Sequence, residues 1–224
     1  MRVYSPIVKK VRAKQVFTDF LCAAPVRKLP KGELLIYQEE AMRQVYVVKS
    51  GAIRCYDISL DGNQQLIWLV TEGELFPVSS PMDPDEKASF FYSAFIDSEV
   101  YVVGRHRFMS FLKANPDTLM TLYNDSVRRL ADLQYRVNAA VKPKSREKIL
   151  HTLAFIADRF KTPRQGERRV EVTLPLTHQD IADLVGLTRE TTTATLQLLR
   201  EEGFVEYDKQ HFFIRRDKIQ HVLW

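Results

Sequence analysis

The chain has 224 residues, of which 45% are hydrophobic and 27% charged, values that exclude a collagen, a low-complexity chain and a coiled-coil rod. No apolar run approaches the ~20 residues of a membrane span or forms a signal-peptide core, so we expect a cytoplasmic protein without a membrane partner. The two cysteines, Cys22 and Cys55, are too few for a disulfide framework or a four-thiolate metal site, and we predict no metal and no cofactor.

The net charge of +5 is compatible with a polyanionic partner but is shared by many unrelated proteins. Residues 1–31 contain eight Lys or Arg and a single acid, Asp19. A charge run of this kind is typical of solvated surface. We therefore predict a solvated arm or a loose first helix.

Short segments rich in β-branched and aromatic residues fill residues 32–103: LLIY, VYVV, AIRCYDI, QQLIWLV and AFIDSEVYVV. Turn signals separate them about every ten residues, a spacing typical of a meandering or jelly-roll β-barrel. We predict a sensor domain over residues 1–114. Aromatic side chains in it could line an effector pocket, although barrel core is the favoured interpretation. The candidate pocket residues are Trp68, Phe76, Val78, Ala88 and Phe91.

After Asn115-Pro116-Asp117 the apolar period becomes helical for about 25 residues, and a dimerisation helix is predicted over 115–141. Two interpretations are open: a seam that pairs two chains in a coiled coil, which we favour, or a helix packed on its own barrel. The predicted seam residues are Leu119, Tyr123, Leu130, Leu133, Val137 and Ala140, with a polar Ser126 among them.

Lys142-Pro143-Lys144-Ser145 interrupts the helix, because proline disfavours helical geometry in the residue before it. Residues 142–224 are therefore predicted to form the last domain. Its first helix starts at Ser145 and ends before the basic loop from Lys161 to Arg169. Two short strands around residues 208–211 predict a β-hairpin wing.

Residues 177–202 have the pattern of a helix-turn-helix. Thr177 and Asp180 form a predicted capping box, Gly186 turns the chain, and Thr188 caps a second helix. Small Ala182 allows the two helices to cross closely. The second helix is predicted to bury Thr192, Leu196 and Leu199 and to expose its polar N-terminal turn.

The exposed turn has side chains that can bind the major groove of double-stranded DNA. Arg189 can donate to guanine and Glu190 can accept from cytosine, so we predict base reading by these two residues and by Thr193. An ordinary solvated first turn is the weaker alternative. Phosphate contacts are predicted for Thr177, Gln179, Thr191, Lys209 and His211.

The segment LTHQDIADLVGLTRETTTATLQLLREEGFV resembles the CRP/FNR family of bacterial transcription factors, and the resemblance covers about residues 31–217. It implies an α+β protein: a jelly-roll barrel like a cyclic-nucleotide-binding domain, a long dimerisation helix and a C-terminal winged helix-turn-helix. Arg189 and Glu190 fall on the family's base-reading positions and Thr191 on a phosphate contact. Ala194 stands where the family usually has a second arginine, which implies an altered or relaxed site.

The sensor half departs from the cyclic-nucleotide-binding branch of that family. Gly73-Glu74-Leu75 aligns with an earlier turn, so the family's binding Gly-Glu pair falls on Pro77 and Val78, and its phosphate arginine falls on Ala88. Without a bidentate arginine a buried phosphate loses its main hydrogen bonds, and we predict that cyclic AMP is not the effector. The sequence supports no iron–sulfur or haem sensor either: His106 is the only histidine in the first 150 residues.

These observations predict a homodimeric, sequence-specific transcription regulator on a pseudo-palindromic DNA site, with an unknown effector or none. By resemblance, the loop from Lys161 to Arg169 would contact RNA polymerase, the alternative being a basic surface loop. The sequence does not distinguish activation from repression. The alternative function is a ligand-binding or protein-interaction module whose winged helix does not read DNA. No nucleophile, phosphate loop or metal spacing supports an enzyme, so no catalytic residue is predicted.

Overall fold

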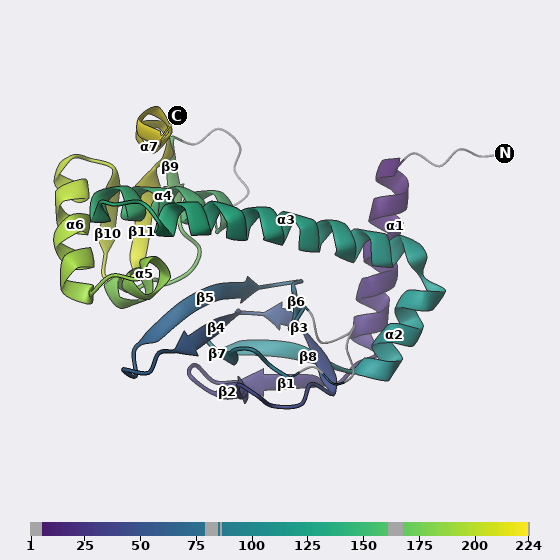
Figure 1. Ribbon diagram of the computed structural model, residues 1–224. Helices are drawn as coiled ribbons and strands as arrows, with labels where there is room; N and C mark the ends of the chain where they lie inside the picture. The colour runs from purple at the N-terminus through teal and green to yellow at the C-terminus, as the bar shows by residue number, and fades with distance from the viewer. Residues whose placement is uncertain (1–5, 79–84, 86, 161–167, 224) are drawn as a thin grey trace. The chain divides into compact units, whose positions relative to one another are not determined.

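The computed structural model describes residues 6–78, 85, 87–160 and 168–223, and it divides the chain into two compact units, residues 1–128 and 129–224 (Figure 1). The division falls within the longest helix, α3 (Pro116–Ala140). The two units are described in turn. The assignment of residues 115–141 as a separate dimerisation helix stays a prediction.

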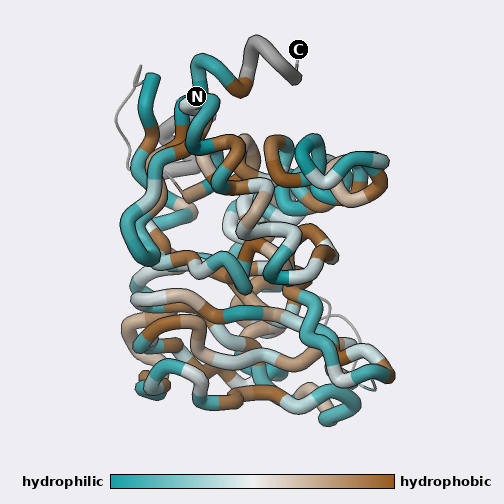
Figure 2. Tube along the Cα trace, turned by 90° about the vertical axis from the view of Figure 1, so that its left-hand side faces the viewer, coloured by the Kyte–Doolittle hydropathy of each residue, from teal (hydrophilic) through white to brown (hydrophobic). Residues whose placement is uncertain are grey.

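Unit 1 contains two four-stranded antiparallel sheets, which confirms the predicted β-sheet domain. One sheet has the order β1 (Val26–Leu29), β8 (Ser98–Gly104), β3 (Gln44–Ser50), β6 (Leu75–Phe76). The other has the order β2 (Leu34–Ile36), β7 (Phe91–Ala94), β4 (Ala52–Ile58), β5 (Gln64–Thr71). Hydrophobic and hydrophilic residues are interleaved along the tube of the chain (Figure 2), and Val45 to Val48 of β3 form one continuous buried stretch.

The segment AFIDSEVYVV is not one strand, contrary to the sequence prediction. Ala94 ends β7 in one sheet and Ser98 begins β8 in the other. Between them the carboxylate of Asp97 accepts a hydrogen bond from the Lys31 backbone at 2.8 Å. Three polar residues, Asp97, Ser98 and Glu99, interrupt the apolar segment where the chain changes sheet, and the apolar residues on both sides contribute to a buried core.

Residues Pro6–Cys22 of the N-terminal segment form helix α1, as the alternative of a first helix predicted, and its second half packs on the core rather than forming a solvated arm. Phe17 and Phe20 pack against α2 (Arg105–Ala114), and the rings of Phe20 and Phe111 stack with centroids 3.9 Å apart. Basic residues dominate the composition of the segment, but its two phenylalanines are three positions apart and therefore lie on one helical face. Burial of these aromatic rings holds α1 against α2.

Helix α3 confirms the predicted helix of about 25 residues. Within unit 1, Thr118 is buried and its hydroxyl donates to the Ala13 carbonyl at 3.4 Å, while Leu122 packs against the barrel core. Large apolar side chains elsewhere on α3 are exposed. They are Leu119, Met120, Tyr123, Val127, Leu130 and Val137, followed just after the helix by Val141.

Two predicted seam positions contribute little to this exposed stripe: one is partly covered and the other is an alanine. Leu133 is half-buried and Ala140 is exposed. Residues 120, 127 and 141 continue the stripe in steps of seven, and the polar Gln134 completes that series. Tyr123, Leu130 and Val137 of the predicted seam therefore belong to the exposed stripe. The predicted positions Leu119, Leu133 and Ala140 each lie one residue before the positions 120, 134 and 141 of that stripe. Residues 119 and 120 are both apolar, so the sequence does not distinguish the two registers.

Unit 2 contains α4 (Ser145–Arg159), α5 (His178–Val185), α6 (Arg189–Glu201) and α7 (Arg216–Leu223). Its sheet has the order β10 (Val205–Asp208), β11 (His211–Arg215), β9 (Arg169–Glu171). The predicted wing hairpin is present as β10 and β11. Strand β9 and helix α7 were not predicted, since β9 is only three residues long and pairs with a strand some forty residues later.

Gly51 and Gly62 both have positive φ, at 87° and 79°, but only Gly51 is crowded: a Cβ there would lie 2.3 Å from the Ser98 Oγ and 2.6 Å from the Asp97 carbonyl. We expect Gly62→Ala to lower the free energy of unfolding by about 1 to 2 kcal/mol through the left-handed backbone alone. Gly51→Ala should cost about 3 kcal/mol or more, because the clash is added. Denaturant unfolding of the full chain checks this, and equal losses would contradict it.

Candidate nucleic-acid interface

Helix α5 starts with the predicted capping box. The Asp180 N–H donates to the Thr177 hydroxyl at 3.0 Å, and the Thr177 N–H donates to the Asp180 carboxylate at 2.7 Å. The Thr177 hydroxyl also donates to that carboxylate at 2.6 Å. Thr177, a predicted phosphate contact, thus has its hydroxyl occupied by the cap, and its backbone fixes where α5 begins.

A glycine in the left-handed backbone conformation joins α5 to α6. Gly186 has φ 67°, and the Leu187 N–H donates to the Ala182 carbonyl at 3.1 Å. Ala182 is fully buried, as expected of a small residue at a helix crossing. Helix α6 then starts at a second cap, where the Thr188 hydroxyl accepts from the Thr191 N–H at 3.2 Å. The chain therefore turns sharply and α6 begins at a defined residue.

Helix α6 has one buried and one exposed face. Thr192, Thr195, Leu196 and Leu199 are buried, which confirms the predicted inward face. Exposed residues of its N-terminal half are Arg189, Glu190, Thr191 and Ala194. The exposed turn is free of large apolar side chains, so it offers donors and acceptors to a partner.

Thr193 is half-buried, and its hydroxyl lies 3.0 Å from the Nδ1 atom of His178. The ring of His178 meets Tyr207 edge-on with centroids 4.9 Å apart. Burial, followed by the positive charge of Arg189, holds the pKa of His178 below 6.5. No sequence pattern distinguishes His178 from a surface histidine, apart from its place next to the predicted cap at Thr177.

The remaining predicted phosphate contacts are exposed. Lys209 and His211 lie at the wing turn, where Lys209 has φ 52°. Gln179 is exposed on α5 and donates to Asp183 at 2.6 Å, while the Thr191 hydroxyl accepts from Thr188 at 2.9 Å. Within unit 2 the structure thus assigns the predicted polar set to three elements: α5, α6 and the wing.

The last part of α3 is fastened to the rest of unit 2 by polar contacts. Arg159 on α4 pairs with Asp132 at 3.1 Å, and Arg136 donates to the Leu184 carbonyl at 3.2 Å. The Tyr135 hydroxyl lies 3.2 Å from the Nδ1 atom of His151. Burial, and to a smaller degree Lys142, lowers the pKa of His151 below 6.5.

The candidate effector residues mostly belong to the barrel core. Trp68, Phe76 and Ala88 are 5%, 1% and 2% exposed, Phe91 is half-buried and Val78 is 38% exposed. The rings of Tyr46, Phe76 and Tyr92 form a stack with neighbouring centroids 5.5 Å apart, and it joins the two sheets because Phe76 and Tyr92 belong to different ones. The favoured interpretation of these aromatic residues as core agrees with this packing.

Glu74 of the Gly73-Glu74-Leu75 segment is held in a turn. Its carboxylate accepts from the Thr71 N–H at 2.7 Å and from the Thr71 hydroxyl at 3.2 Å, and Gly73 has φ 79°. Lys87, next to Ala88 in sequence, pairs with Glu39 at 3.6 Å on the surface. Both charged side chains are thus engaged by neighbours within the barrel.

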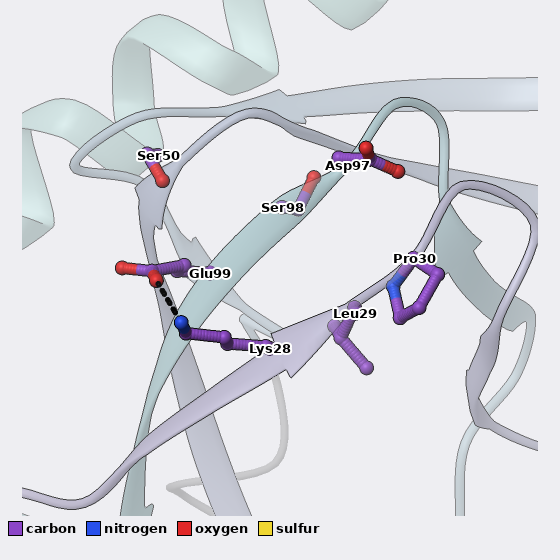
Figure 3. Close-up of a pocket in the computed structure, with 7 residues that line it drawn as sticks. All are labelled: Lys28, Leu29, Pro30, Ser50, Asp97, Ser98 and Glu99. Atoms are coloured by element: carbon purple, nitrogen blue, oxygen red, sulfur yellow. Dashed lines mark ion pairs between the residues drawn. The ribbon is translucent and has the colours of Figure 1, made fainter.

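Unit 1 also has a shallow pocket of about 390 Å³ away from these residues (Figure 3). It is lined by Lys28, Leu29, Pro30, Ser50, Asp97, Ser98 and Glu99. Glu99 pairs with Lys49 at 2.8 Å and with Lys28 at 3.9 Å. None of the candidate effector residues lines this pocket.

Neither cysteine of the chain forms a disulfide; Cys22 is exposed and Cys55 is buried. Among the described residues no group of three or more His, Cys, Asp or Glu side chains could hold a metal ion, and His106 is exposed. No helix in the described part of the chain is long and apolar enough to cross a membrane. Residues 161–167 of the loop expected to contact RNA polymerase lie outside the described residues.

Comparison with known proteins identifies both parts of the chain. Residues 26–115 match the profile of a cyclic nucleotide-binding domain, and residues 147–219 match that of a Crp-like helix-turn-helix domain. The cyclic AMP receptor protein of Thermus thermophilus is 27% identical over 80% of this chain and 78% of its own length. The transcriptional activatory protein AadR of Rhodopseudomonas palustris is 29% identical over 82% and 74%.

Solved structures share the fold. FixK2 from Bradyrhizobium japonicum aligns with a TM-score of 0.75 at 21% identity, over 89% of this chain and 96% of its own. The c-di-GMP responsive regulator CLP of Xanthomonas campestris aligns with a TM-score of 0.72 at 16% identity, over 90% and 98%.

A cyclic-nucleotide-binding-like barrel followed by a Crp-like helix-turn-helix defines a class of DNA-binding transcription regulators. The chain belongs to the CRP/FNR family of these regulators, as the sequence resemblance implied.

The lowered pKa values of His151 and His178 predict a pH-dependent stability of unit 2. As the pH falls below 6.5, the unfolded chain takes up protons at these positions before the folded chain does, so the free energy of unfolding decreases. We expect the denaturant midpoint of unit 2 to be lower at pH 5.5 than at pH 7.5.

The double variant His151→Gln, His178→Gln should flatten that dependence while both hydrogen-bond positions keep a polar group. His211→Gln, an exposed wing residue, serves as the control and should leave it unchanged. A double variant with the same pH dependence as the wild type would contradict the assignment.

Proposed function

We propose that the chain acts as a homodimer that presents two copies of α6 to successive major grooves of a pseudo-palindromic DNA site. The main support for this proposal is the structure of α6. Its inner face is buried, its first turn is capped, and Arg189 and Glu190 are exposed at its N-terminal end. A helix presented in this way can insert its N-terminal residues between the walls of a major groove. Two-fold symmetry of the protein then requires two-fold symmetry of the site.

Base reading in this proposal rests on Arg189 and Glu190, with Thr193 one turn further on the face of Arg189. Arginine donates to the O6 and N7 atoms of guanine, and glutamate accepts from the N4 amino group of cytosine. Ala194 has no polar group to offer, so fewer bases are fixed in each half-site. Lys209, His211, Gln179 and Thr191, together with Thr177 at the start of α5, set the register on the phosphates.

The exposed apolar stripe of α3 supports the dimer. Met120, Tyr123, Val127, Leu130 and Val137 follow a spacing of three and four residues. This is the spacing of a two-chain coiled coil, in which Gln134 would be a polar position that fixes the register. A second copy of the same helix buries the stripe.

The barrel is proposed not to use cyclic AMP. The relative from Thermus thermophilus is named for that ligand, but here Ala88 occupies the position expected for the phosphate arginine, and Glu74 is bound to Thr71. The stack of Tyr46, Phe76 and Tyr92 fills space between the sheets. A cyclic nucleotide would lack a bidentate partner for its phosphate.

Arg189→Gln tests the base-reading role. We expect it to weaken binding to the preferred duplex by about 1 to 3 kcal/mol and to relax preference at one base pair in each half-site. Lys209→Gln should instead weaken all duplexes alike and reduce the salt dependence. Gln197→Ala, an exposed α6 position beyond the first turn, is the inert control in fluorescence-anisotropy titrations.

A loss of affinity without relaxed base preference would make Arg189 a phosphate contact. Arg189→Glu also separates the proposal from the alternative of a protein-interaction module. The reversal should abolish DNA affinity, and unchanged DNA affinity would contradict the proposal.

Leu130→Lys tests the dimer. Burying two lysines in an apolar seam is unfavourable, so we expect the variant to sediment as a monomer and to lose specific DNA affinity. Asp125→Lys adds a lysine outside the stripe and should remain dimeric, since Asp125 is exposed and its ion pair with Arg128, at 3.5 Å, lies on the surface. A dimeric Leu130→Lys variant would contradict the assigned seam.

Isothermal titration with cyclic AMP tests the barrel. We expect no saturable heat at 1 mM ligand concentration, a limit of about −4 kcal/mol in binding free energy, and no change in DNA affinity. Binding in the micromolar range would overturn this part of the proposal.

A further inference from the structure

His178 lies where four elements of unit 2 meet. It is the first residue of α5, its Nδ1 atom lies 3.0 Å from the Thr193 hydroxyl on α6, and its ring meets Tyr207 of β10 and Phe212 of β11 edge-on, with centroids 4.9 and 6.1 Å away. Tyr207 and Phe212 stack on each other at 5.2 Å. The imidazole therefore connects the helix-turn-helix to the wing.

The hydrogen bond between His178 and Thr193 has a direction that depends on protonation. In the neutral tautomer that carries its proton on Nε2, the imidazole accepts at Nδ1, so Thr193 uses its only proton toward the ring and offers lone pairs alone to a partner. A protonated imidazole can only donate, so Thr193 accepts from the ring and its own proton becomes available. The same threonine is thus an acceptor in one state and a donor in the other.

The groups around His178 determine which state it adopts. From α6 the charged neighbour is Arg189, which disfavours a second positive charge. From β10 and β11 the rings of Tyr207 and Phe212 make T-shaped contacts with the imidazole, and the Arg200 guanidinium lies over the Tyr207 ring at 5.1 Å. On α5 itself the Asp180 carboxylate accepts from Thr177. Burial by the aromatic rings and the charge of Arg189 both favour the neutral state near pH 7.

Thr193 is placed to transmit this difference to a ligand. It lies one helical turn after Arg189, so the two side chains share a face of α6. Arg189 is exposed and Thr193 is half-buried, with His178 behind it. A change in the direction of one hydrogen bond at Thr193 therefore alters the donor and acceptor pattern beside Arg189.

We propose that His178 is a specificity-determining positioning residue: its hydrogen bond with Thr193 decides whether that hydroxyl meets DNA as an acceptor or as a donor. The inference rests on the proposed function, since it needs α6 in the major groove. It adds that base preference beside Arg189 depends on pH. The neutral state favours an amino group of adenine or cytosine, and the protonated state favours a carbonyl or N7 acceptor.

The test measures relative affinities of the full-length protein for four duplexes that differ only at the base pair nearest Thr193, at pH 5.5 and pH 8.0. That pair is located first as the one whose preference Thr193→Val removes. We expect the ratio of affinities between duplexes to change by roughly two- to tenfold between the two pH values, which is the contribution of a single hydrogen bond. Ratios between duplexes cancel any uniform effect of phosphate contacts, and His211→Gln is the control for the exposed histidine of the wing.

His178→Gln should bind DNA with a base preference that no longer changes with pH, because the amide can donate or accept but does not titrate in this range. A wild-type preference that is constant with pH, or a pH shift that persists in His178→Gln, would overturn the inference while leaving the proposed function intact. Absence of any sequence preference at either pH would overturn the proposed function itself.

A measurement without DNA tests the His178 inference separately from the proposed DNA-binding function. In the free protein, the nuclear magnetic resonance signal of the His178 Nδ1 atom should move at both pH 5.5 and pH 8.0 when Thr193 becomes valine, because the ring then loses its hydrogen-bond partner in both protonation states. An unchanged Nδ1 signal in Thr193→Val at both pH values would show that the hydrogen bond is not formed in solution and would overturn the inference.

Discussion

The presentation of α6 depends on the left-handed backbone at Gly186. The chain leaves α5 and enters α6 within three residues because Gly186 adopts a left-handed conformation, with φ of 67°. A residue with a Cβ would be strained at this φ. The sharp turn lets Ile181 and Val185 of α5 share a core with Leu196 and Leu199 of α6. With the apolar side chains committed to that core, the first turn of α6 is left to polar residues, and the two threonine caps fix where each helix starts.

Helix α3 contributes both to the proposed dimer seam and to the contacts that hold the helix-turn-helix. Its first part packs through Thr118 and Leu122 on unit 1, and its last part is tied through Asp132 and Arg136 to α4 and α5. The Asp132 to Arg159 pair joins the two helices that flank Lys142-Pro143-Lys144, so an ion pair spans the segment predicted to interrupt the helix. An effector that repositions α6 would have to act on this contact as well as on the proline segment.

The helix-turn-helix was predictable because its determinants are local: caps, a turn glycine and a helical apolar period lie within about 26 residues. Features that depend on distant partners were not. Strand β9 exists because it pairs with β11, α1 packs because α2 offers Phe111, and the change of sheet at Asp97 depends on the Lys31 backbone. The contact of His178 with Thr193 likewise joins residues on two helices, and no periodicity in either helix indicates it.

In the proposed complex, two copies of the chain read a symmetric site through α6. Selection from a random duplex pool with the purified full-length protein, in the absence of any added ligand, tests this arrangement. We expect a two-fold symmetric site whose half-sites are centred one helical turn, about 34 Å, apart, with guanine or cytosine at the Arg189 and Glu190 positions. Enrichment of an asymmetric site bound by one chain, or no enrichment at all, would contradict it.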